Sequence, residues 1–154
     1  MQIFQPQDVT LAIANLRTQK NARVSNSRGQ ISFGLFPSNN HNFPVGDIHL
    51  KLGFIGNGHR RKGAYGLRHI WEKHGAELGL TAPLQVPDFI KTVLQPGANV
   101  IVDHSKSSDK PLIVESNNGL VTLGVVKPNN EPPYYHIITA YGRKSHPGII
   151  IANL

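Results

Sequence analysis

The sequence predicts a single α+β domain in which N-terminal helices pack on one face of a twisted antiparallel β-sheet. Three helical patterns lie before residue 95, and four successive strand patterns come after it. Asn117-Asn118-Gly119 separates two of these strands and is typical of a tight hairpin, because Asn and Gly tolerate positive φ. The 154 residues suit one domain, with a first helix and basic loops in 1–63 and a second helix and the antiparallel sheet in 64–154.

Each expected element has a local basis. A helix over 8–19 carries apolar residues at helical spacing behind Asp8, and a polar loop follows over 20–30. The best helical pattern covers 65–75, with Gly75 as its C-terminal cap, and a shorter helix over 87–94 begins near a proline. The expected strands cover 31–36, 47–52, 99–103, 111–116, 120–126, 134–141 and, at an edge, 149–152.

The composition indicates a loop-rich globular protein with a basic surface. Gly occurs 15 times and Pro 11 times, and the net charge is +7, which attracts polyanions such as nucleic acid. The absence of cysteine excludes disulfides and thiolate metal sites. No apolar run approaches the ~20 residues needed to cross a bilayer, so we expect no membrane segment. The first residues also lack the pattern of a signal peptide, so an exported chain would need another carrier.

Two of the eight histidines, His69 and His74, fall on the helix expected over 65–75. His74 shares a face with apolar residues, whereas His69 lies with Lys73 on a more polar side. Being five residues apart, the two imidazoles stand roughly 140° apart around an α-helix. A zinc pair prefers a spacing of four, so metal binding is disfavoured. Structural roles remain alternatives, with His74 as a core residue at the helix end and His69 as a surface residue.

The strand expected over 134–141 carries a second group of polar residues. One face of a regular strand would hold Tyr135, Ile137, Thr139 and Tyr141, with Arg143 continuing it if the strand persists. A hydroxyl, a phenol and a guanidinium in a row can bind phosphate oxygens. The alternative is a half-buried strand whose residues simply have good β-propensity.

The order of these two segments resembles a known group of nucleases. The stretch Tyr65-Gly66-Leu67-Arg68-His69-Ile70-Trp71-Glu72-Lys73-His74 has the pattern G-x-x-H-I-x-x-x-H, and Ile137-Ile138-Thr139-Ala140-Tyr141 closes the sheet. Together they span about 64–146 and resemble the barnase–EndoU–colicin–RelE (BECR) superfamily of phage and bacterial toxin nucleases. Members are metal-independent ribonucleases without a cofactor. Many are C-terminal toxin domains of contact-dependent growth inhibition systems, neutralised by an immunity protein.

The resemblance implies a site and a place of action. The catalytic positions correspond to His69, His74, Thr139, Tyr141 and, more loosely, Arg143. Positive charge for the substrate is expected from Arg60, Arg61, Lys62, Arg68, Lys73 and Lys144. Glu72 is the only acid expected nearby, so a glutamate base of the barnase kind is not expected. The implied partners are an RNA substrate, with tRNA as one candidate, and a cognate immunity protein, with action in the bacterial cytoplasm after delivery in a larger effector.

Metal-free RNA cleavage needs groups of these kinds. The ribose 2′-OH must lose a proton as it attacks phosphorus, the leaving 5′-oxygen must gain one, and cations must stabilise the added charge. Histidine can perform either proton transfer near neutral pH. Only RNA carries the internal nucleophile, and its products are a 2′,3′-cyclic phosphate and a 5′-hydroxyl. Which histidine is the base and which the acid stays open at this point.

Two other function classes compete with this one. A non-catalytic nucleic-acid-binding domain would use the positive charge and a stacking surface at Tyr134 and Tyr135, but it leaves the histidine helix unexplained. A metal-dependent DNase would need a carboxylate cluster, for which the sequence offers Asp103, His104 and Asp109. Cleavage of RNA in excess chelator separates the three classes.

Overall fold

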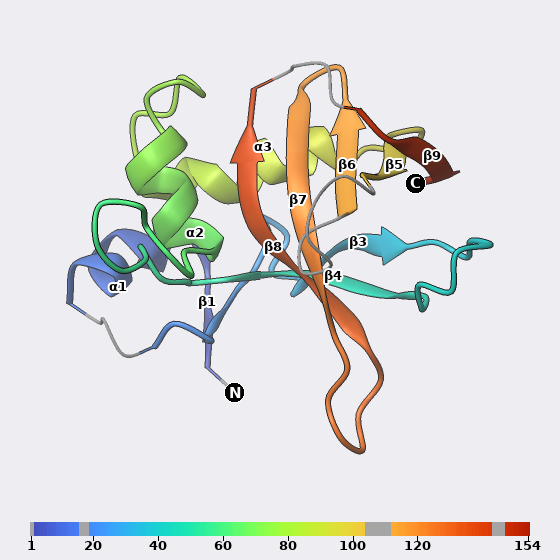
Figure 1. Ribbon diagram of the computed structural model, residues 1–154. Coiled ribbons are helices and arrows are strands. Elements are labelled where there is room, and N and C mark those ends of the chain that lie inside the picture. Colours follow the sequence, from blue (N-terminus) through green and yellow to red (C-terminus); the bar gives the residue numbers. More distant parts are fainter. Residues whose placement is uncertain (1, 16–18, 104–111, 143–146) are drawn as a thin grey trace.

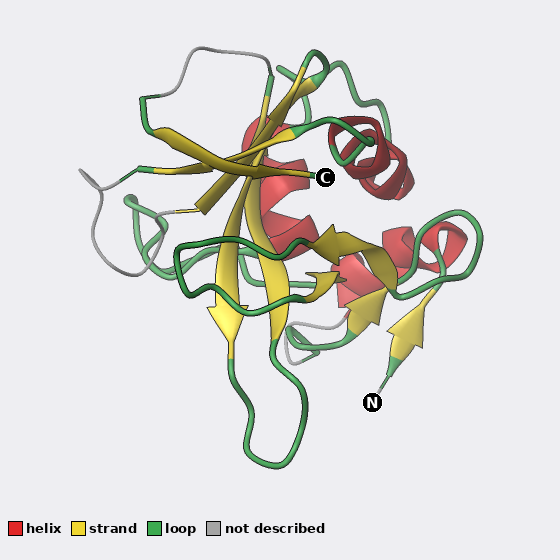
Figure 2. Ribbon diagram, turned by 90° about the vertical axis from the view of Figure 1, so that its right-hand side faces the viewer, coloured by secondary structure: helices red, strands yellow, loops and turns green. Residues whose placement is uncertain are grey.

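The computed structural model describes residues 2–15, 19–103, 112–142 and 147–154, which form a mixed α+β fold around one sheet. The strands lie in the order β1 (Ile3–Phe4), β2 (Arg23–Val24), β4 (Gly46–Lys51), β8 (Tyr134–Tyr141), β7 (Gly119–Val126), β6 (Leu112–Ser116), β5 (Asn99–Val102) and β9 (Ile149–Asn153), and β3 (Ser32–Phe36) pairs with β4. Figures 1 and 2 show the two termini well apart, as expected for strands at the two ends of this order.

The helices cover one face and one edge of the sheet (Figure 1). They are α1 (Val9–Asn15) after a 3₁₀ turn at Pro6–Asp8, α2 (Gly66–His69) continuing as a π-helical turn over Ile70–His74, and α3 (Val86–Val93) after a 3₁₀ turn at Pro83–Gln85. The core on this face buries apolar residues of α2 and α3 against β7 and β8. No described helix is long and apolar enough to cross a membrane.

The sheet is mixed, not purely antiparallel as predicted. β4 and β8 run parallel, with Ile48 opposite Tyr135 and His49 opposite His136, and β1 and β2 are also parallel. The chain between β4 and β8 contains α2, α3 and three strands, which is ample for the long crossover that parallel neighbours need. Because β4 belongs to the first 63 residues, that portion supplies part of the sheet as well as a helix and loops.

Strand β8 pairs with β4 over only a short part of its length. Among the described residues the two strands pair at Tyr135 and His136, and β8 also contacts α2. Figure 1 shows α2 standing beside β8 while α3 passes behind the strands. The helix and the strand that the sequence singled out are therefore neighbours.

Most predicted elements are present with shifted ends. The helix expected over 8–19 contains the shorter α1, the one over 87–94 is α3 within a residue, and the strand over 134–141 is β8. The strands β1 and β2 were not predicted, and β2 lies in the segment 20–30 that was expected to be a loop. A two-residue strand has no periodic pattern, so only its pairing with β4 identifies it.

Gly75 is the C-cap residue of the helix, as predicted, but its backbone there is not left-handed. Its φ of −55° is helical rather than positive, and the chain continues through turns to Gly79, which has a φ of +71°. A Cβ atom at Gly75 would lie 2.6 Å from the Trp71 carbonyl oxygen and 2.8 Å from its ring. Glycine is therefore needed at position 75 for the close approach of Trp71, and not for a left-handed backbone.

Candidate functional site

The π-helical turn over Ile70–His74 brings His69 and His74 together. Residues five apart stand roughly 140° apart on an α-helix, but hydrogen bonding from i to i+5 places them about one turn apart. The two rings lie edge to face, with centroids 5.5 Å apart and an interplanar angle of 87°. Both residues are buried, so the alternative of His69 as a surface residue is wrong.

His74 connects the helix to β8 and to an acidic side chain. Its ring lies edge to face with Tyr141, with centroids 4.7 Å apart. Its Nδ1 atom pairs with the Glu77 carboxylate, which orients the ring. Glu72, the acid expected from the sequence, forms an ion pair with Arg61 instead. The i,i+3 spacing of His74 and Glu77 was the available signal for the correct acid.

A β-bulge in β8 decides which face Thr139 and Tyr141 occupy. Two adjacent residues of β7 stand opposite Ile137 and Thr139, so Ile138 is the extra residue on β8. The prediction that Thr139 and Tyr141 share the face of Ile137 is therefore wrong, since Ile137 points into the main core. Thr139 and Tyr141 lie on the opposite face, together with His136.

Besides Nδ1 of His136, three buried polar atoms of the helix and β8 have no hydrogen-bond partner among the described residues. They are Nδ1 of His69, Nε2 of His74 and Oγ1 of Thr139. Leaving a buried polar group unsatisfied costs about 1–3 kcal/mol, so a group of them indicates atoms kept available for a ligand. We call His69, His74, Glu77, Thr139 and Tyr141 the histidine cluster.

The electrostatics of the cluster make its two imidazoles different. Burial lowers the pKa of His69 to about 4, and the positive charges of His74, Lys73 and Arg61 lower it in the same direction. At neutral pH His69 is therefore an uncharged ring that can accept a proton. The His74 ring, by contrast, has a carboxylate beside it.

The basic residues predicted to bind substrate differ in their exposure and in their partners. The Arg68 guanidinium is buried and donates to the carbonyl oxygens of Gly53 at 3.0 Å and Ala12 at 3.3 Å, so it is used within the fold. The exposed cations are Arg60, Lys62 and Lys73, while Arg61 pairs with Glu72. Arg143 and Lys144 lie outside the described residues.

A second polar group occupies the same face of the sheet, and of its residues only Tyr134 was singled out from the sequence, as part of a stacking surface. The rings of His49 and Tyr134 stack, with centroids 4.9 Å apart. The charged ends of Arg23 and Lys51 lie 4.9 and 5.5 Å from the centroid of the Tyr134 ring. His136, the register partner of His49, completes the group. We call Arg23, His49, Lys51, Tyr134 and His136 the strand cluster.

Part of the strand cluster could have been found in the sequence. His49 and Lys51 alternate with buried apolar residues along β4, which places both on the face away from the main core. Arg23 had no such signal, because β2 is only two residues long. Burial lowers the pKa of His136 to about 4, and the charges of Lys51 and Arg23 lower it further.

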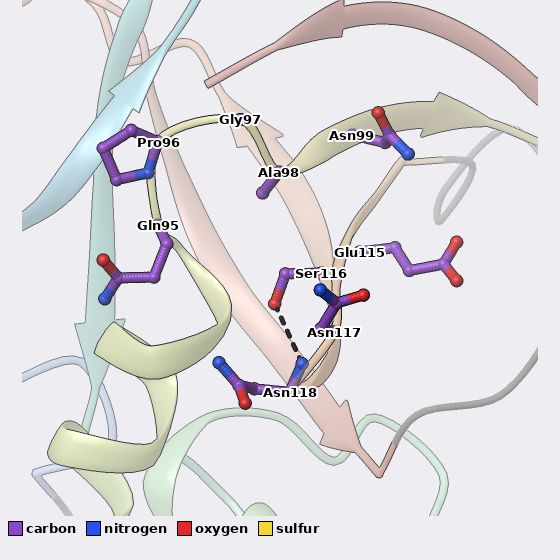
Figure 3. A pocket seen from close by; sticks show the side chains of 9 residues that line it. All are labelled: Gln95, Pro96, Gly97, Ala98, Asn99, Glu115, Ser116, Asn117 and Asn118. Atoms are coloured by element: carbon purple, nitrogen blue, oxygen red, sulfur yellow. Dashed lines mark hydrogen bonds between the residues drawn. The ribbon is translucent and has the colours of Figure 1, made fainter.

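A cavity of about 360 Å³ opens between the end of α3, the start of β5 and the β6–β7 hairpin (Figure 3). Its polar lining is supplied mainly by Gln95, Asn99, Glu115, Ser116, Asn117 and Asn118. The lining contains no histidine, lysine or arginine and no member of either cluster. It therefore lacks the proton carriers and cations that the two clusters provide.

A metal-dependent enzyme would need several metal-ligating side chains close together. Among the described residues, no three His, Asp or Glu side chains are grouped so as to hold a metal ion. His104 and Asp109, named above for such a site, lie outside those residues.

Comparison with known protein families, curated proteins and solved structures finds no match for this chain.

Proposed function

We propose that the protein is a metal-independent endoribonuclease whose active site is the histidine cluster. The observation that carries this proposal is the pair of touching imidazoles with opposite surroundings. His69 has a pKa lowered to about 4, mainly by burial, whereas His74 is paired with the carboxylate of Glu77. One ring is suited to accept a proton and the other to hold and donate one.

The reaction assigns one transfer to each ring. His69 takes the proton from the ribose 2′-OH as that oxygen attacks the adjacent phosphorus. His74, held by Glu77, donates a proton to the departing 5′-oxygen as its bond to phosphorus breaks. The products are a 2′,3′-cyclic phosphate and a 5′-hydroxyl, and a subsequent exchange of one proton with water returns both rings to their starting states.

The other members of the cluster act on the phosphate. Thr139 Oγ1 lacks a hydrogen-bond partner among the described residues, so its hydroxyl is available to donate to a phosphate oxygen. Tyr141 packs against the His74 ring and limits its orientations. The exposed cations Arg60, Lys62 and Lys73 lie on or next to the segment that carries the histidines and attract the polyanion.

The wider biological role belongs to the same proposal. A motif helix beside a long strand supports the BECR-like arrangement that the G-x-x-H-I-x-x-x-H pattern implies. On that basis we propose a toxin that cleaves RNA, with tRNA as one candidate, in the bacterial cytoplasm. A cognate immunity protein would then cover the histidine cluster or the basic residues beside it.

Cleavage of RNA in excess EDTA tests the proposal directly. We expect cutting to persist, with cyclic phosphate and 5′-hydroxyl ends identified by mass spectrometry. A substrate carrying 2′-deoxyribose at the cut position should bind but stay whole, because it lacks the nucleophile. Cutting only with added Mg²⁺ would support the metal-dependent alternative, and binding without any cutting would support the non-catalytic binding domain.

A further inference from the structure

The strand cluster contains two buried cations that form no ion pair with a described acid. Arg23 and Lys51 stand directly opposite each other on β2 and β4, and each is only 9% exposed. Among the described residues neither forms an ion pair with a carboxylate. Like charges opposite each other destabilise a sheet, and a buried charge is costly unless it is paired. A fold retains such a pair most readily where an anion binds.

The polar contacts of these cations are with neutral groups. Arg23 donates from Nε to His49 Nδ1 at 3.2 Å and from Nη1 to the carbonyl oxygen of Asn21 at 2.6 Å. Asp47, the acid on the same face of β4, is exposed and accepts a hydrogen bond from Ser32 Oγ at 3.0 Å. Its charge acts on His49, but among the described residues it forms no ion pair with Arg23 or Lys51.

His136 adds a third nitrogen-bearing group to the same place. Its Nδ1 atom is buried and has no hydrogen-bond partner among the described residues. Gly124 stands opposite on β7, and a Cβ there would lie 3.0 Å from His136 Nε2, so the absence of a side chain leaves the ring its space. The ring also contacts Tyr65, whose hydroxyl is occupied in a hydrogen bond to Asn21 Oδ1 at 2.8 Å.

The strand cluster and the histidine cluster lie on the same face of the sheet. His136 precedes Thr139 by three residues on β8, and the bulge places both on the same face. Their partners on β7, Gly124 and Thr122, are two residues apart, so at about 3.3 Å per residue the two positions are roughly 7 Å apart along the strand. One RNA strand lying along β8 could therefore contact both clusters at once.

We propose that Arg23, Lys51 and His136 form a subsite for a phosphate of the RNA strand that flanks the phosphate being cut. The position of this subsite rests on the proposed ribonuclease function, whereas its capacity to bind a phosphodiester does not. The guanidinium and ammonium groups supply charge and donors, and the free Nδ1 of His136 supplies a further donor when protonated.

The first test measures binding of a 2′-O-methyl RNA oligonucleotide, which cannot be cut by this route. We expect Lys51→Met to weaken binding by roughly tenfold and to lower the slope of log affinity against log salt by about 0.7 for the lost phosphate contact. The matched control is Lys127→Met, which removes an exposed charge from the β7–β8 hairpin. Lys51→Arg keeps the charge and should bind nearly as the unaltered protein does.

A second test measures the stability of the protein without RNA and the response of His136 to inorganic phosphate. We expect Lys51→Met to unfold at the same or a higher urea concentration than the unaltered protein, because it removes a buried repulsion. NMR titration should show the pKa of His136 raised by Lys51→Met, and raised in the unaltered protein by added phosphate. A structural role for Lys51 predicts the opposite change in stability and no response of His136 to phosphate.

The outcomes separate this inference from the proposed function. If Lys51→Met and Lys127→Met weaken RNA binding equally, the subsite is overturned, while cleavage that depends on His69 and His74 stands. If the subsite binds as expected but no RNA is cut, the ribonuclease proposal fails and the phosphate-binding inference stands.

Discussion

The two clusters lie on one face of one sheet but are built from different groups. The histidine cluster combines two imidazoles, a hydroxyl, a phenol and one carboxylate, and its rings touch each other. The strand cluster concentrates cations around a stacked pair of rings and has no ion pair among the described residues. Paired, orientated groups suit proton transfer, whereas unpaired cations suit the binding of an anion. The difference indicates that chemistry and substrate binding occupy neighbouring parts of the same surface.

The histidine cluster depends on two departures from regular secondary structure. The π-helical turn places His69 against His74, and the bulge at Ile138 moves Thr139 and Tyr141 to the face of His136. The π-helical turn and the β-bulge each add one residue to the regular repeat of their element. The side chains that follow therefore point to a different side than a regular helix or strand would give them.

The largest expected effect is the loss of cleavage in variants of His69 and His74. His69→Ala or His74→Ala should lower the rate by about 10²–10⁴-fold, the usual loss for a general acid or base, with little change in affinity for 2′-O-methyl RNA. Single-turnover cleavage and binding assays measure the two quantities separately. His41→Ala, on an exposed loop, is the matched control. Near-normal rates in both cluster variants would remove the histidine mechanism.

An intermediate effect is expected from Glu77→Gln, which keeps the size of the side chain but removes its charge. Loss of a hydrogen bond to a charged group of about 1.5–3 kcal/mol corresponds to roughly a 10–100-fold lower rate. Because Glu77 acts through His74, the loss should appear in the single-turnover rate and not in the affinity for 2′-O-methyl RNA. Glu72→Gln is the matched control, since Glu72 pairs with Arg61. Equal losses of rate in the two variants would show that Glu77 does not position His74 for cleavage.

The smallest effect concerns acid stability, to which both clusters contribute. His69 and His136 have pKa values lowered to about 4 in the folded protein, from 6.5. The unfolded chain therefore binds more protons between these values, so stability should fall as the pH decreases from about 6.5 to 4. Urea unfolding at several pH values measures this loss. His136→Gln should flatten the dependence, whereas the exposed His41→Gln should leave it unchanged, and a dependence that persists fully in His136→Gln would contradict the prediction.

The local patterns of the chain were sufficient for most elements of the fold. Apolar spacing identified α3 and the segment of α2, and alternation identified β8 and its neighbours, because these signals depend on residues close in sequence. The same patterns singled out His69, His74, Thr139 and Tyr141 as candidates. They could not identify β2, and with it Arg23, since a two-residue strand exists only through its partner.

What the sequence determined by itself is therefore the kind of residue available and most of the secondary structure that carries it. The tertiary structure alone decided which of those residues meet. His69 and His74 touch only because the helix widens by one residue per turn next to β8, and His136 joins Thr139 only because β8 bulges. Arg23 faces Lys51 because β2 pairs with β4, although the two residues are 28 positions apart in the sequence. These are long-range packing and pairing energies, which no local pattern contains.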